Sequence, residues 1–216
     1  MRPEIKAEEL EKRLSDAFHK LDIPAEDRLL LHARISGLKT YHLPTYEHSI
    51  RVALKSVDIA EYTRGWIEQR AVFYPGLLHD TGKKLIRKEI LDKITGWTHH
   101  DLKEIEPHAK IGAGIVGDMY EFSAWVIMNS HKLVKDDKTQ LDRNPNFSEK
   151  TNLLVWDCAR LLHIADFYDS ATYRLNERNS PGNPRYLNPN EVRECLIRES
   201  RDKRSFIEGL YSAGIL

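Results

Sequence analysis

The chain has 216 residues, of which 41% are hydrophobic, and its 33 basic residues are balanced by 33 acidic ones. A chain of this size can bury a substantial core without dividing, so we predict a single domain over residues 1–216. The charge balance argues against a protein that holds nucleic acid chiefly through phosphate contacts, but it leaves small anionic substrates open.

The two cysteines and the apolar runs limit where the protein works. Cys158 and Cys195 match neither a CxxC zinc pattern nor a dense disulfide framework, which favours a reducing, cytoplasmic setting. No apolar run approaches the roughly 20 residues that a membrane helix needs. The first residues, MRPEIKAEELEKRL, are charged and lack the apolar core of a signal peptide. We therefore expect a soluble protein that does not bind membranes.

The apolar spacing in the first 82 residues predicts packing helices followed by two helices that carry histidines. The predicted elements span residues 6–20, 25–36 with a break at Gly37, a helix capped by Thr45 that contains His48, and 66–80 with a stop signal at Gly82. The pair His79-Asp80 is therefore expected at the end of a helix.

The rest of the chain continues the helical pattern, with no alternating strand pattern. The predicted helices lie near 87–93, near 98–104 with Thr98 as the cap, from Pro107 through a run of small residues, and at 120–132, 149–173, 189–200 and 202–212. Loops are expected at 133–147, which is charged, and at 176–189. We predict an all-α fold with packing helices over 1–40, a core over 41–175 and a C-terminal loop and helices over 176–216.

Six side chains from these helices form a candidate site for divalent metals: His48, His79, Asp80, His108, His131 and Asp166. Imidazole nitrogens suit iron, manganese, zinc or nickel, and a carboxylate can bridge two ions. Helix bundles build metal sites from residues on different helices. The spacing of the six residues along the chain does not by itself prove that they converge.

Five segments carry a resemblance to the HD superfamily of metal-dependent phosphohydrolases. The segments YEHSIRV (46–52) and GLLHDTGK (76–83) resemble that superfamily's lone histidine and its later HDxGK element. Downstream, EILDK (89–93), PHAKIGA (107–113) and LHIADFYDS (162–170) are similar to elements of the HD-GYP branch. The resemblance covers about residues 41–175 and implies a helical bundle with a metal site in its core.

Carried over by position, the resemblance implies that His48, His79, Asp80 and Asp166 form the core metal site, with Asp80 as the bridge. It also implies that His108 and His131 complete a second metal site, and that Lys83 contacts the substrate phosphate. The expected cofactors are two divalent transition metals, with iron or manganese as the first choice and nickel, cobalt or zinc as alternatives. Asp80 and Lys83 are the predicted catalytic residues.

The chain departs from the HD-GYP pattern at two places. Where that branch has paired histidines and then GYP, this chain has MNSHKL (128–133), with His131 alone and no GYP. The cyclic di-GMP specificity associated with that stretch is therefore not predicted. Pro44 stands where members with a third metal carry an acidic ligand, so a third metal is not expected.

The sequence thus predicts hydrolysis of a small phosphoester, for example a nucleotide, by a metal-activated water, as a phosphodiesterase or a phosphatase. Candidate residues for binding the anionic substrate are Lys83, Arg51, Arg174 and Arg178, since guanidinium groups match phosphate oxygens. Two alternatives remain open: a degenerate HD domain that binds a nucleotide for regulation, and an oxygenase with a di-iron centre. A homodimer is compatible with the sequence.

Overall fold

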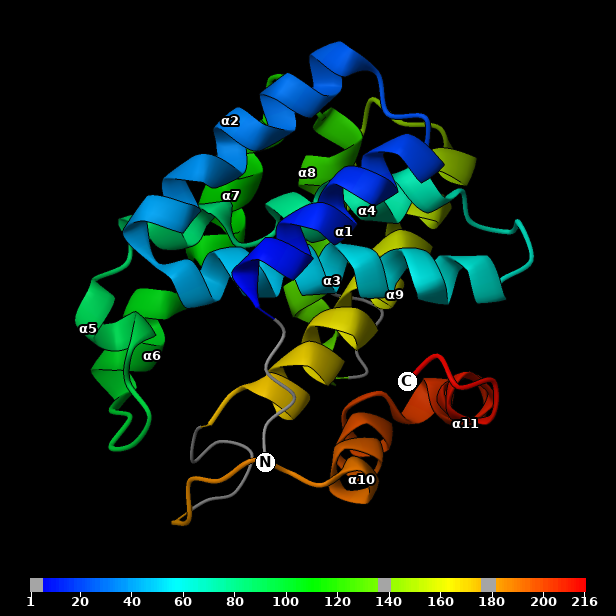
Figure 1. Ribbon diagram of the computed structural model, residues 1–216. Coiled ribbons are helices and arrows are strands. Elements are labelled where there is room, and N and C mark those ends of the chain that lie inside the picture. The colour runs from blue at the N-terminus through cyan, green and yellow to red at the C-terminus, as the bar shows by residue number, and fades with distance from the viewer. Residues whose placement is uncertain (1–5, 136–140, 176–181) are drawn as a thin grey trace.

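The computed structural model describes residues 6–135, 141–175 and 182–216, and within these ranges the chain forms helices and loops with no β-strand (Figure 1). The predicted all-α class is confirmed. None of the helices in the described ranges is both long enough and apolar enough to span a bilayer. Arg178 and the middle of the predicted loop 133–147 lie outside the described residues.

The helices follow one another along the chain with short connections. The first half contains α1 (Ala7–Lys20), α2 (Ala25–Tyr41), α3 (Leu43–Tyr62), α4 (Gln69–Leu78), the 3₁₀ helix η1 (Thr81–Leu85), α5 (Lys88–Leu91) and α6 (His99–Ile105). The second half contains α7 (His108–Gly117), α8 (Glu121–Ser130), the 3₁₀ helix η2 (His131–Lys135), α9 (Glu149–Tyr173), α10 (Pro189–Glu199), the 3₁₀ helix η4 (Arg201–Lys203) and α11 (Arg204–Ser212).

Two predicted boundaries around the first histidine helix were wrong. Helix α2 continues through Gly37 to Tyr41, because Leu38 is completely buried and keeps the last turn packed against the core. Helix α3 begins at Leu43 with a proline in its first turn, and the side chain of His42 caps it by accepting a hydrogen bond from the Thr45 amide. Thr45 is therefore inside the helix and does not cap it.

Two apolar clusters hold the helices around a central layer in which α3 and α4 pack against each other and against α9 (Figure 1). The first cluster joins α1 and α2 to one side of this layer, through buried residues that include Leu10, Leu14, Phe18, Leu31, Ile35, Ile50, Phe73 and Leu77. The second joins α9 to α10 and α11, through residues that include Val155, Leu162, Leu196, Ile207 and Leu210. The terminal helices therefore support the helices that carry the candidate site.

Helices α3 and α4 approach each other closely at a glycine. A Cβ atom at Gly76 would lie 2.8 Å from the Cα atom of Ala53, so any larger residue would push the two helices apart. His48 lies on α3, and His79 directly follows the last residue of α4. The contact at Gly76 thus helps to set the separation of the two imidazole rings.

Candidate metal centre

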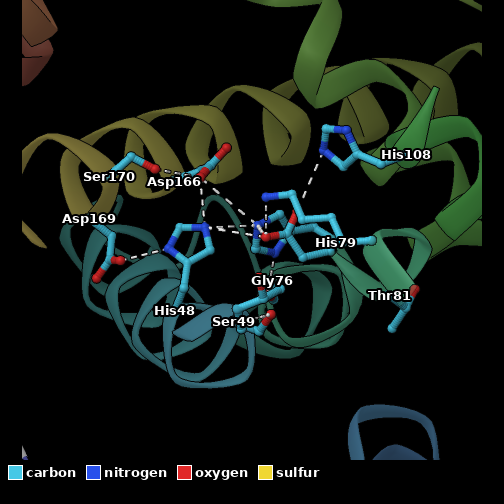
Figure 2. A network of polar contacts seen from close by, with 12 residues as sticks. His48, Ser49, Gly76, His79, Thr81, His108, Asp166, Asp169 and Ser170 are labelled. Carbon is cyan, nitrogen blue, oxygen red and sulfur yellow. Dashed lines mark hydrogen bonds and ion pairs between the residues drawn. The ribbon is translucent and has the colours of Figure 1, made fainter. Parts of the chain in front are cut away.

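One group of possible ligands joins three helices of the central layer. His48 on α3, His79 at the end of α4 and Asp166 on α9 each offer a ligand atom, and these atoms lie within 4.8 Å of one another (Figure 2). His48 Nε2 is 3.3 Å from His79 Nε2 and 3.0 Å from Asp166 Oδ1. Both imidazole side chains are 1% exposed. We call these three residues the first group.

Asp80, His108 and His131 form a second group next to the first. His108 is the first residue of α7, and His131 is the first residue of η2. Their Nε2 atoms are 2.8 Å apart, and His108 Nε2 is 3.5 Å from Asp80 Oδ1. The structure therefore brings together all six predicted metal-ligating side chains, in two sets of three.

The carboxylate of Asp80 lies between the two groups. Its Oδ2 atom is 3.6 Å from His48 Nε2 and 3.5 Å from His79 Nε2, whereas Oδ1 faces His108. Oδ1 is buried and has no hydrogen-bond partner among the described residues. A buried carboxylate oxygen without a partner is costly, and a bound cation would satisfy it. The donor set of imidazoles and carboxylates therefore fits divalent metals.

Hydrogen bonds at Nδ1 turn three of the rings so that Nε2 faces the centre. His79 Nδ1 is 2.8 Å from the carbonyl oxygen of Gly76, and His108 Nδ1 is 2.5 Å from that of Ile105. His48 Nδ1 is 2.6 Å from Oδ2 of Asp169. Since these acceptors require a proton on Nδ1, the Nε2 lone pairs are left for a metal, as in metal-binding histidines generally.

Burial and charge give these side chains the protonation states that ligands need. Burial lowers the pKa of His79 and His131, and it lowers the pKa of His108 to about 3, so these three imidazoles are neutral near pH 7. Burial opposes ionisation of Asp80 and Asp166, but the basic groups around these carboxyls hold the pKa of each well below its usual range. Neutral imidazoles and ionised carboxylates are the forms that bind metals.

Two predicted substrate-binding cations border this centre. Lys83 Nζ lies 2.7 Å from Asp80 Oδ2, and the lysine side chain is 7% exposed. Burial lowers the pKa of Lys83, although the carboxylate of Asp80 opposes that change. Arg174, just after the end of α9, is 37% exposed, and its Nη2 atom is 3.8 Å from Asp80 Oδ2. Lys83 is thus part of the buried centre, and Arg174 lies at its edge.

Arg51 lies elsewhere, against a residue that the sequence did not single out. Its Nε and Nη2 atoms donate hydrogen bonds of 2.7 and 3.0 Å to the carboxylate of Asp169, which is also the partner of His48. The signal for Asp169 was present in the segment LHIADFYDS, because a residue three positions after Asp166 lies on the same face of a helix. His163 is buried on α9 but belongs to neither group.

A close contact at Gly82, which the sequence did not reveal, keeps the second group next to the first. A Cβ atom at Gly82 would lie 2.0 Å from the carbonyl oxygen of His108 and 2.7 Å from the amide nitrogen of Gly112. The turn after Asp80 therefore touches the backbone of α7 directly. This contact holds His108 near Asp80.

Comparisons with known proteins agree with this architecture. The model of the family described as HD domain matches residues 45–171. The crystal structure of the HD domain of the L. monocytogenes phosphodiesterase PgpH is similar, with a TM-score of 0.54 and 18% sequence identity over 84% of this chain and 88% of that one. At this identity the likeness shows the fold.

A search of curated proteins found no match. The nearer resemblance to the HD-GYP branch stays a prediction. The family match spans more than half of the chain and includes both groups of possible ligands together with Lys83 and Asp169. The chain therefore belongs to the HD domain family.

Proposed function

We propose that the protein is a phosphohydrolase that uses two divalent metals to cleave a small phosphoester, such as a nucleotide. The observation that carries this proposal is the position of Asp80 between two groups of imidazoles and carboxylates, with a buried Oδ1 atom that lacks a partner among the described residues. Membership of the HD domain family and the likeness to the HD domain of a phosphodiesterase support it.

In this proposal each group would hold one metal, and Asp80 would be a ligand available to both. A pair of such metals supplies a nucleophilic water at neutral pH and neutralises negative charge on the phosphoryl oxygens. Iron or manganese is the first choice, because imidazole and carboxylate donors suit both, with nickel, cobalt and zinc as alternatives. Asp80 stays ionised beside these ligands because the basic groups around it lower its pKa.

Lys83 and Arg174 are proposed to bind the phosphate. The buried ammonium group of Lys83 lies against Asp80, so a phosphoryl group next to Asp80 would be within reach of this charge. Arg174 is more exposed, and its guanidinium fork matches the geometry of phosphate oxygens. Lys83 is thus assigned to the reacting phosphoryl group, and Arg174 to the part of the substrate nearer to solvent.

Metal analysis and hydrolysis assays test this proposal together. We expect protein reconstituted with Mn²⁺ or Fe²⁺ to contain two metals per chain by mass spectrometry, and to hydrolyse p-nitrophenyl phosphate or bis(p-nitrophenyl) phosphate. His79→Ala should abolish hydrolysis, and His108→Ala should reduce the content to about one metal. His100→Ala, on the exposed surface of α6, is the matched control.

Three results would contradict the proposal. A content of one metal per chain in both the wild type and His108→Ala would show that the second group does not hold a metal. Protein with two metals that cleaves neither reporter, and whose His79→Ala variant changes only in nucleotide affinity, would favour the regulatory binding module. Consumption of oxygen that depends on iron and on a candidate substrate would favour the oxygenase.

A further inference from the structure

Asp169 is a buried carboxylate directly behind the first group. It lies on α9 three residues after Asp166, and its side chain is 3% exposed. Figure 2 shows it on the side of the His48 ring that faces away from His79. Its Oδ2 atom is 2.6 Å from His48 Nδ1, so the carboxylate accepts a hydrogen bond from this ring nitrogen. Asp169 therefore fixes both the tautomer and the orientation of His48.

Arg51 holds Asp169 in that position. The guanidinium group donates two hydrogen bonds to the carboxylate, and it lies over the ring of Tyr173 at 4.5 Å from the ring centre. The Arg51 side chain is only 10% exposed. Among the described residues, no ion pair links Arg51 to any of the six possible metal ligands. Its position therefore argues against the predicted contact with substrate.

His48, in the first group, differs from the other two supported histidines in the charge of its acceptor. His79 in the same group and His108 in the second donate Nδ1–H to neutral backbone carbonyls, whereas His48 donates to an anion. A carboxylate in this role raises the basicity of the other ring nitrogen and holds the ring in one orientation. Arg51 offsets the charge of Asp169, which would otherwise be a costly unpaired charge in the interior.

We propose that Asp169, held by Arg51, is a positioning residue that orients His48 and makes the first group the tighter of the two metal sites. The proposal shares with the proposed function only the premise that the centre binds metals. In this proposal Arg51 supports metal binding indirectly, because it holds Asp169. Arg174 is then the arginine that faces the substrate.

Titration of metal-free protein with Co²⁺ tests this proposal, since the visible absorption of Co²⁺ reports on its ligands. We expect two binding steps in the wild type, with the tighter step weakened about 10–100-fold in Asp169→Ala and less in Asp169→Asn. Arg51→Met should weaken the same step, and Arg51→Lys should restore part of the affinity. Arg160→Met is the matched control, because Arg160 lies on α9, as Asp169 does, and its ion pair is with Asp202 of η4.

Several outcomes would overturn the proposal. Wild-type Co²⁺ affinities in Asp169→Ala would do so. An equal loss of Co²⁺ affinity in Arg160→Met would also do so, because it would reveal a general effect of removing an ion pair on α9. Unchanged Co²⁺ affinity in Arg51→Met, together with a raised KM for the phosphoester reporter, would show that Arg51 binds the substrate. If Asp169→Ala does not fold, Asp169→Asn and Arg51→Lys decide the question.

The proposed function fails separately from this proposal. Two Co²⁺ steps with the expected dependence on Asp169, but no phosphoester hydrolysis, would refute the hydrolase and leave the role of Asp169 standing. Hydrolysis with two bound metals whose affinities do not depend on Asp169 would refute the role of Asp169 and leave the hydrolase standing. A ¹⁵N spectrum of the metal-free protein adds an independent measurement, because the His48 ring should carry its proton on Nδ1 in the wild type and lose this preference in Asp169→Ala.

Discussion

The two groups of possible metal ligands are built in different ways. The first group comes from the packed layer of α3, α4 and α9, where Gly76 against Ala53 sets the helix spacing. The second group takes its histidines from the first residues of α7 and η2, and it depends on the backbone contact at Gly82. The His108 side chain is 12% exposed, against 1% for His48. We therefore expect the second group to be the more easily disturbed.

Replacing the residue that joins the two groups should have the largest effect. Asp80→Asn removes the shared negative charge and leaves the buried Lys83 without its counter-charge. We expect at most one bound metal and a loss of hydrolysis beyond about 100-fold, which is the upper range for residues that only support a ligand. Mass spectrometry and a reporter assay measure both. Asp92→Asn, at a carboxylate that is 66% exposed, is the control, and two retained metals in Asp80→Asn would contradict a shared role.

Gly82→Ala should separate the second group from the first. The added Cβ would overlap backbone atoms of α7, so α7 must move and take His108 with it. Overpacking of this kind costs about 1–3 kcal/mol, and we expect the metal content to fall from two toward one with the first site retained. Gly114→Ala, on α7 itself, adds a Cβ that meets no atom within 4 Å and should keep both metals. Equal metal contents in the two variants would show that the contact at Gly82 does not hold the second group.

Acid should destabilise the metal-free protein through histidines of both groups. Burial lowers the pKa of His79, His108 and His131 in the folded state, so the unfolded chain takes up protons first as the pH falls. The free energy of unfolding should be highest above pH 6.5 or so and should decrease below it, where unfolded histidines titrate. Thermal unfolding in EDTA between pH 8 and pH 5 measures this decrease.

Variants can assign the acid sensitivity to one group or the other. His79→Gln and His108→Gln each remove one such histidine, so each should flatten the dependence of Tm on pH. A wild-type Tm that rises as the pH falls from 7 to 5 would show that the imidazoles are not held neutral. A flatter curve in only one variant would locate the effect in one group.

Arg174→Ala should have the smallest effect, because this arginine lies at the edge of the centre. We expect KM for the phosphoester reporter to rise about 10-fold, equivalent to about 1.4 kcal/mol, while the metal content stays at two. Arg185→Ala, which breaks a surface pair with Glu191, is the control. Loss of a metal in Arg174→Ala would mean that this arginine supports Asp80 and does not serve the substrate.

Local signals in the sequence predicted those elements whose ends are set by neighbouring residues. Helix α9 spans residues 149–173 as predicted, with Ser148 as its cap, and Thr98 caps α6 together with Asp101. Gly37 was a misleading stop signal, because the burial of Leu38 outweighs the small cost of a glycine within a helix. Propensity thus failed where tertiary packing decided the outcome.

By itself, the sequence determined the helical class through local spacing, and its HD-type motifs implied the six possible metal ligands through their resemblance to the HD superfamily. Only the tertiary structure decided how the ligands divide into two groups, that Asp80 lies between them, and that Arg51 faces Asp169. The physical reason is that the ligands come from five separate segments, with only His79 and Asp80 adjacent in the chain. Their distances therefore depend on helix crossings and on backbone contacts at Gly76 and Gly82, which no local pattern encodes.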